Sequence, residues 1–354
     1  MRPNCPIKIR LNTLPLFLLA LGGGYSTLKA IDGQLQFSTY YDSNVREALT
    51  APDSTLGLTL RGRLSHEIHP RRLNIFAELL TQANVDAIFR EQSKLIVNAE
   101  LDFRYALSPA LQVLGNLSHF QKSFYNHTGS YMWTEYSTFL QLSPGTRYTG
   151  WLGYRYRKKT LAATEKYRFG ENDLEFRGRY HINPRIFFEG TFTGSRIVHT
   201  DFNAVGVVDD TSLVFLDYPQ KDRGVEALMH VRYRGKIIAG LQIGICTVGS
   251  NSVIGEFSLV SYHAYISGNL RPSTFYHLVF RRIDKAYQYP ELKGESWYRD
   301  PEEPTQNLVH FRLEQVLRGG SIGYVHVSLL ENETIFTQRY YDKTMIEVGI
   351  KYEL

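Results

Sequence analysis

Apolar and polar residues alternate along much of the chain, and the last eleven residues show the pattern most plainly. In the segment 344–354, the residues Ile346, Val348, Ile350 and Tyr352 share one face, and the polar residues between them share the other. Side chains of a β-strand point to opposite faces with a period of two. Because chain ends usually fray unless they are tied into a sheet, this segment is predicted to be a paired strand.

The same alternation recurs through the chain, usually over ten residues or more, and one face of each segment is crowded with charge. It predicts sixteen strands, near 34–41, 55–66, 72–82, 94–106, 110–121, 131–142, 146–158, 171–182, 185–197, 224–234, 236–247, 253–267, 272–283, 306–317, 321–329 and 344–354. Boundaries read from a sequence shift by several residues, so 14 and 18 strands also remain possible.

The links between these segments fall into two length classes. After every second strand the link is short and carries Pro, Gly or a basic turn, at 67–71, 107–109, 143–145, 183–184, 234–235, 268–271 and 318–320. The other links are longer, at 42–54, 83–93, 122–130, 159–170, 198–223, 284–305 and 330–343, with a short exception at 248–252. Short periplasmic turns and long extracellular loops are typical of a transmembrane β-barrel.

The physics of lipid explains why such strands would alternate. Every backbone polar group in a bilayer must be bonded within the protein, so only helices and closed barrels span it. The predicted fold is therefore all-β, a closed antiparallel transmembrane β-barrel with apolar side chains toward lipid and polar ones inside. A secreted soluble sandwich or propeller would also alternate, but its strands are usually five or six residues long.

The first thirty residues predict export. Arg2, Lys8 and Arg10 precede the apolar stretch 14–24, which is too short to cross a bilayer as a helix. This is the form of a signal peptide, 1–30, with cleavage after Ala30 or earlier, after Ser26. The remaining chain, 31–354, is predicted to be a single barrel domain.

Removal of that segment changes the charge balance. The chain has 40 bases and 35 acids, and loss of four bases leaves 36 bases. The basic character is therefore partly the signal, and it does not indicate nucleic-acid binding. Only Cys246 would remain, so no disulfide can form within one processed chain.

Two short segments resemble a known class. The last strand, with Val348, Ile350, Tyr352 and Leu354 at alternate positions, resembles the C-terminal assembly signal of bacterial outer-membrane barrels, although that signal commonly ends in Phe or Trp. The segment YYDSNV, 40–45, looks like one found in poorly characterised porin-like families, and its polar residues are turn formers. The resemblance implies outer-membrane lipid as surroundings, the barrel assembly machinery as a partner, and a possible homotrimer.

The predicted inward face is where function would lie, because sixteen strands leave an aqueous channel unless something fills it. The candidate pore-lining residues are Arg61, Arg63, Arg104, Arg147, Arg155, Arg157, Glu175, Arg177, Arg179, Arg232, Arg234 and Arg312. Rings of arginine favour anions in pores, so passive diffusion of small polar or anionic solutes is expected. Arg155, Arg157, Arg177 and Arg179 come from adjacent strands and are expected to form an excess positive patch, unless the charges pair across strands.

Other chemistry finds little support in the sequence. Ser118 and His119 are adjacent on a predicted strand and would face opposite sides, and no metal-ligand spacing or phosphate-binding loop is present. No cofactor, metal or enzymatic activity is expected. Two alternatives stay open: a barrel that serves a partner in export or surface assembly through the loops 198–223 and 284–305, or a barrel enzyme acting on lipid or surface polymer.

Aromatic residues are abundant, with 24 Tyr and 20 Phe. Because Tyr and Trp favour the membrane–water interface, several are expected in outward girdles. They are Tyr40, Tyr105, Tyr131, Trp133, Tyr148, Tyr154 and Tyr352. Trp151 falls on an inward position, where it could contact a solute.

Overall fold

The computed structural model describes residues 31–44, 53–69, 72–125, 130–161, 168–209, 212–253, 255–287, 306–332 and 341–354. The expected signal peptide lies outside these residues. Among them, no helix is long and apolar enough to cross a membrane.

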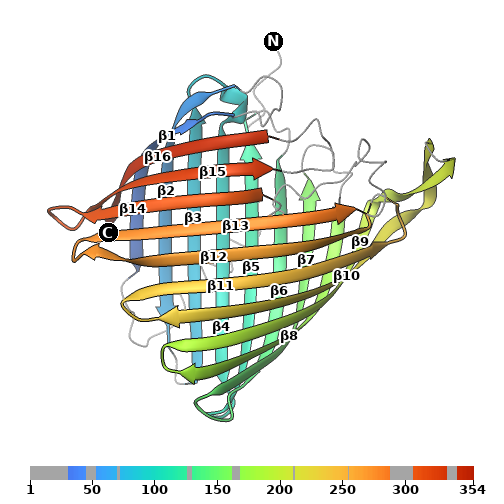
Figure 1. The fold of residues 1–354 in the computed structure, drawn as a ribbon, viewed down its shortest axis with the longest axis horizontal. Helices are drawn as coiled ribbons and strands as arrows, with labels where there is room; N and C mark the ends of the chain where they lie inside the picture. The colour runs from blue at the N-terminus through green and yellow to red at the C-terminus, as the bar shows by residue number, and fades with distance from the viewer. Residues whose placement is uncertain are drawn as a thin grey trace.

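Sixteen antiparallel strands form one closed barrel, in which each strand pairs with its sequence neighbours and β1 pairs with β16 (Figure 1). The strands are β1 (Asp32–Asp42), β2 (Thr55–Ile68), β3 (Leu73–Asp86), β4 (Lys94–Ala106), β5 (Leu111–Phe124), β6 (Tyr131–Leu142), β7 (Tyr148–Leu161), β8 (Arg168–Asn183), β9 (Ile186–Asp209), β10 (Ser212–Arg234), β11 (Ile237–Ser250), β12 (Phe257–Arg271), β13 (Thr274–Tyr287), β14 (Gln306–Val316), β15 (Ile322–Asn332) and β16 (Tyr341–Glu353). A single 3-10 turn, η1 (Arg90–Gln92), lies between β3 and β4. The predicted fold class and strand number are confirmed.

The two end strands close the wall, as the alternation in the last segment predicts. β1 and β16 run antiparallel in continuous register, from Gln34 opposite Glu353 to Asp42 opposite Met345. At the far end of this pair, the Asp42 carboxylate accepts a hydrogen bond from the backbone of Asn44 at 3.0 Å and lies 2.8 Å from the ammonium of Lys343. The chain therefore bends at Ser43 as β1 ends, and the residues that follow Asn44 lie outside the described part of the chain.

One expected loop is instead part of the sheet. The segment 198–223 was predicted as a long loop, but β9 and β10 continue through it as a hairpin that extends beyond the other strands (Figure 1). Pro219 lies where the register between the two strands shifts, which accommodates its missing N–H. The prediction was wrong because a strand can continue past a proline when the proline lies at a β-bulge, where pairing is interrupted only locally.

The outer surface of the barrel is apolar. On β2, for example, Leu56, Leu58, Leu60 and Leu64 are 45–61 % exposed, whereas Gly57, Thr59, Arg61 and Arg63 face the interior. Large exposed apolar side chains alternate in this way on most strands. An apolar outer face on a closed antiparallel wall is the surface that a bilayer covers, because such a wall leaves no backbone edge unpaired.

The aromatic girdle is partly as predicted. Tyr105, Tyr148, Tyr154 and Tyr352 are outward and exposed. Tyr40, Tyr131 and Trp133 were placed wrongly, because the strand pairing puts them on the inner face. The Tyr40 ring fills the space over Gly57 on β2, and its hydroxyl donates to Asp86 at 3.4 Å.

Candidate functional site: the inner wall of the barrel

Most of the candidate residues lie on the inner face of a strand, because they alternate with exposed apolar residues. Arg147 does not, since it lies in the exposed turn before β7. The inward candidates are Arg61, Arg63, Arg104, Arg155, Arg157, Glu175, Arg177, Arg179, Arg232, Arg234 and Arg312.

Four arginines on β7 and β8 form a charge ladder with carboxylates on β6, β8 and β9. Arg155 lies 2.8 Å from Asp173, and Arg157 lies 2.7 Å from Glu135. On the next strand Arg177 lies 2.6 Å from Glu175, and Arg179 lies 2.6 Å from Glu189. Further carboxylate contacts join Arg155 to Glu175 and Arg157 to Glu171.

The expected excess positive patch at these four arginines is therefore wrong. The strand register sets Arg155 directly opposite Asp173, and Arg179 directly opposite Glu189. Opposite charges at paired positions of neighbouring strands attract each other, so the arginines are neutralised by the wall itself. The alternative, in which the charges pair across strands, holds for Arg155, Arg157 and Arg179, whereas Arg177 pairs with Glu175 on its own strand.

Aromatic rings contact the guanidinium groups of Arg177 and Arg179. The guanidinium of Arg179 lies 4.7 Å from the ring centre of Phe187 and 5.2 Å from that of Trp151. The guanidinium of Arg177 lies 5.7 Å from Trp151 and 5.9 Å from Phe139. Cation–π attraction of this kind helps to hold the guanidinium groups close to the wall.

A second region, here called the basic wall, runs along the inner face of β10 to β14. Among the described residues, only one of its four arginines has a carboxylate within ion-pair distance, namely Arg312 with Glu314 at 2.7 Å. Imidazoles lie between the arginines. The basic wall consists of Arg232, Arg234, Arg281 and Arg312 with His230, His263, His277 and His310.

Sequence reasoning included Arg232, Arg234 and Arg312 among the candidates but missed the imidazoles of the basic wall, because each histidine was considered alone. The structure brings the imidazoles into one row: the rings of His277 and His310 are 5.9 Å apart, and the next pair, His310 and His326, is 4.0 Å apart. The shared inward parity of these positions on neighbouring strands was the available signal.

An acidic strip lies on β3 and β4. Glu78 and Glu100 are directly opposite in the strand register, and Asp102 follows on the same face. Asn116 donates to Glu100 at 2.9 Å and to Asp102 at 2.8 Å, while Arg63 neutralises Glu78 at 2.5 Å. In the closed ring of strands, β3 and β4 lie across the interior from β11 and β12. Carboxylates thus gather on the inner face of β3 and β4, with Arg63 and Arg104 beside them, whereas arginines and imidazoles gather on the opposite wall.

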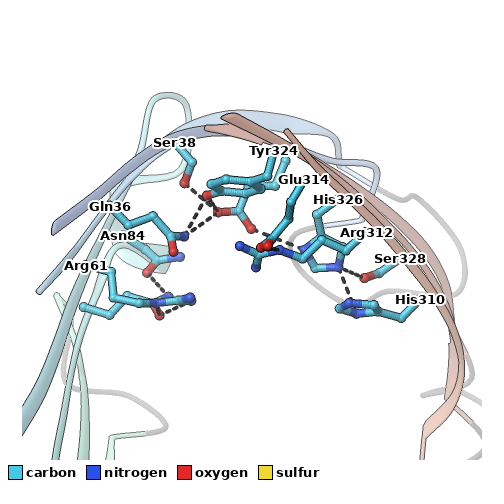
Figure 2. A network of polar contacts seen from close by, with 12 residues as sticks. Gln36, Ser38, Arg61, Asn84, His310, Arg312, Glu314, Tyr324, His326 and Ser328 are labelled. Carbon is cyan, nitrogen blue, oxygen red and sulfur yellow. Dashed lines mark hydrogen bonds and ion pairs between the residues drawn. The ribbon is translucent and has the colours of Figure 1, made fainter. Parts of the chain in front are cut away.

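A polar network covers the inner side of the seam between β1 and β16 (Figure 2). The Glu347 carboxylate accepts hydrogen bonds from Ser38 on β1 and from Tyr324 on β15, both at 2.6 Å. Gln36 donates to the same tyrosine oxygen at 2.7 Å. His326 continues the network toward the basic wall, since one of its ring nitrogens lies 2.9 Å from a ring nitrogen of His310.

One cluster has the residue types of a hydrolase but not the arrangement. Asp222 lies 2.7 Å from the buried imidazole of His199 and accepts a hydrogen bond from Ser250 at 2.5 Å. Gln220 donates to both oxygens of the same carboxylate. The serine hydroxyl therefore points at the carboxylate and not at the imidazole, whereas a serine nucleophile needs the imidazole as its base. The cluster ties β9, β10 and β11 together.

The adjacent residues Ser118 and His119 point to opposite faces of β5, as expected for neighbours on a strand. Ser118 faces inward, and His119 faces outward, where its ring nitrogen lies 2.9 Å from the hydroxyl of Thr134. Among the residues that the structure describes, no group of three His, Cys, Asp or Glu side chains could hold a metal ion.

No family model matches the chain, and no curated protein matches it. Solved structures with similar folds include a triple mutant of a Rhodopseudomonas blastica porin, at 11% identity and a TM-score of 0.43, covering 92% of this chain and 99% of that chain. Pseudomonas aeruginosa OccK11 is 12% identical with a TM-score of 0.46 and covers 92% and 96%. A bacterial polysaccharide outer membrane secretin is 6% identical with a TM-score of 0.47 and covers 91% and 98%.

The fold is assigned from the strand pairing of this chain itself. A closed sixteen-stranded antiparallel wall with an apolar outer face is the architecture of a porin-like barrel of the bacterial outer membrane. Its inner face carries charge of both signs, and this is the surface that a permeating solute would meet.

Proposed function

We propose that the protein is a porin-like channel that lets small polar solutes diffuse across the outer membrane. The observation that carries the proposal is the reversal of polarity across the wall: leucines of β2 face outward while Arg61 and Arg63 of the same strand face inward. Charged side chains are costly against lipid, so an inner face that carries them is built to be wet. A sixteen-stranded barrel is wide enough for an aqueous channel.

We further propose a modest preference for anions, and we place its origin on the basic wall. Arg232 and Arg281 have no carboxylate within ion-pair distance among the described residues, unlike the arginines of the charge ladder. Uncompensated guanidinium groups raise the local concentration of anions, and the effect falls with ionic strength.

Liposome swelling with the purified full-length protein tests the channel. Swelling in uncharged sugars is expected, and liposomes that stay impermeable to every small sugar would overturn the proposal. The reversal potential in a salt gradient tests the anion preference: Arg232→Gln with Arg281→Gln should shift it toward cation selectivity. The matched double variant with lysine at both positions should keep the wild-type value, because the charge is retained.

The proposal extends to the surroundings of the barrel. We infer export through the segment 1–30, insertion by the barrel assembly machinery, contact with outer-membrane lipid, and a possible homotrimer. Protease and lipase assays on the same sample address the enzymatic alternative, and pull-down through the extended hairpin of β9 and β10 addresses the alternative of a partner-serving barrel. A turnover abolished by Asp222→Asn would favour an enzyme over a channel.

A further inference from the structure

We propose that a trough on the inner wall of β2 to β6 binds a small zwitterionic solute, such as a free α-amino acid, during its passage. The inference deepens the proposed channel function and rests on it. A cavity of about 510 Å³ is hollowed into this part of the wall. Its lining includes Glu67, Asn74, Phe76, Asp102, Arg104 and Phe139. Pockets of a few hundred Å³ with a few polar groups are the usual form of small-molecule sites.

Of the three charged residues that line the trough, Asp102 and Arg104 lie side by side without an ion pair between them, while the Glu67 carboxylate lies 3.3 Å from the imidazole of His69. Asp102 and Arg104 are two residues apart on β4, so both face the interior, and the exposed Phe103 between them faces outward. In the described part of the chain, the guanidinium of Arg104 has no hydrogen bond or ion pair, in contrast to those of the charge ladder. The one hydrogen bond to Asp102 is the 2.8 Å contact from Asn116 to its Oδ1. An anion-binding group and a cation-binding group are thus both available in one cavity.

The neutral groups complete the ammonium side of the site. Asn74 donates to Glu67 at 3.0 Å, which leaves its own amide oxygen buried without a hydrogen-bond donor. A buried acceptor without a partner costs free energy, and a donor from a solute would remove that cost. An ammonium group has three donors to offer, and the Asn74 oxygen and the Asp102 carboxylate are acceptors.

The carboxylate side of the site is Arg104. A guanidinium presents planar donors that match the two oxygens of a carboxylate. The Cα atoms of Asp102 and Arg104 are separated by two strand residues, roughly 6.6 Å, and the long arginine side chain can close the remaining distance to a zwitterion. The rings of Phe76 and Phe139 line the same cavity and would contact an apolar side chain.

The charges decide between a zwitterion and the other solutes that could enter. A simple anion would meet Asp102 and Glu67, and a simple cation would meet Arg104, so each would be repelled by one side of the trough. A neutral sugar would use the amides and the rings but would leave the unpaired charges unused. A zwitterion satisfies both charges at once.

Four related probes separate these cases, with binding measured calorimetrically on the full-length protein in detergent. They are L-leucine, N-acetyl-L-leucine, which keeps only the carboxylate, L-leucinamide, which keeps only the ammonium, and N-acetyl-L-leucinamide, which has no charge. Leucine is expected to bind about tenfold more tightly than either singly charged probe. Equal binding of leucine and the uncharged probe would overturn the proposal, and so would tighter binding of maltose than of leucine.

Variants assign each charge to its residue. Arg104→Gln should weaken leucine and N-acetyl-leucine and should strengthen leucinamide, because it removes the charge that repels a cation. Asp102→Asn should weaken leucine and leucinamide. Lys351→Gln on β16, on the inner face but outside the trough, is the control and should bind leucine as the wild type does. Unchanged leucine binding in both trough variants would overturn the proposal. The comparison of probes on the unaltered chain stands even where a variant does not fold.

The proposed binding site and the proposed channel can be disproved independently of each other. Leucine binding in detergent, with no swelling of proteoliposomes diluted into leucine or into small sugars, would contradict the channel and keep the trough. Swelling without charge-dependent binding would keep the channel and contradict the trough.

Discussion

Ser38 on β1 donates a hydrogen bond to Glu347 on β16, with 2.6 Å between the hydroxyl and the carboxylate oxygen. The two residues lie 309 positions apart in the sequence, and they meet at the seam where the first and last strands close the barrel. A sheet that closes on itself has no free edge, so the seam is where the wall depends on contacts between the ends of the chain.

The first prediction concerns this seam. Glu347→Gln keeps the shape of the side chain but removes the charge that accepts from Ser38 and Tyr324. Hydrogen bonds to a charged group contribute about 1.5–3 kcal/mol, so the free energy of unfolding should fall by that order. Denaturant titration followed by the heat-modifiable gel shift measures it. Glu353→Gln, at the exposed end of the same strand, should change little; equal effects of both variants would contradict a special role for the seam.

The second prediction concerns a close approach of a ring to the backbone. The Phe139 ring lies over Gly153 on the neighbouring strand, where an added Cβ would come within 2.0 Å of the ring. Gly153→Ala should therefore destabilise the barrel by about 1–3 kcal/mol, the usual cost of overpacking. Gly178→Ala is the control, because nothing lies within 4 Å of an added Cβ there. Restoration of stability by Phe139→Ala in the Gly153→Ala background would identify the clash as the cause.

The third prediction concerns the charge ladder. Replacement of both Arg177 and Arg179 by glutamine leaves Glu175 and Glu189 without these partners. The ion selectivity of the channel should shift toward cations, measured as the reversal potential in a planar bilayer. Lysine at both positions preserves the charge and should preserve the selectivity. A shift in the lysine variant as large as in the glutamine variant would show that the effect is not electrostatic.

The fourth prediction concerns the lipid-facing side of β5 and β6. His119 is 8 % exposed, and one ring nitrogen lies 2.9 Å from the Thr134 hydroxyl. Thr134→Val would leave that nitrogen unpaired beside lipid, and the free energy of unfolding should fall by about 1–3 kcal/mol. Thr138→Val, on the same face of β6 but exposed, should be neutral or slightly stabilising. A larger drop in the thermal unfolding temperature for Thr134→Val than for Thr138→Val would support this role of the hydroxyl. An unchanged stability of Thr134→Val would refute it.

Much of the inner surface was predictable one strand at a time. The period of two separates Arg61 and Arg63 from the leucines beside them, and it separates Ser118 from His119. Tyr40 and Tyr131 show the limit of that reasoning: they were assigned to the membrane interface from residue type, although their positions fall on the inner face. The residue type was given more weight than the parity, and the pairing of β1 with β2 and of β5 with β6 decides otherwise.

The relation between strands was not predictable in the same way. Arg155 is neutralised by Asp173, whereas Arg232 has no carboxylate at ion-pair distance among the described residues, and nothing in the local sequence of either arginine distinguishes them. The difference lies in which residue the neighbouring strand places opposite each of them. For the same reason the row of imidazoles from His277 to His326 is visible only once β13, β14 and β15 are in register.

By itself the sequence determined the strands, their approximate number, their two unlike faces and the closure of the wall, because these follow from a period-two pattern and from the need of backbone groups for partners in lipid. Only the tertiary structure decided which charges form ion pairs and which do not. Ion pairing depends on which residue each neighbouring strand places opposite a charge, and this is set by the strand register and by the closure of the barrel. Asp102 and Arg104 are only two residues apart in the sequence, but the cavity that they share with Phe139 exists only in the folded wall.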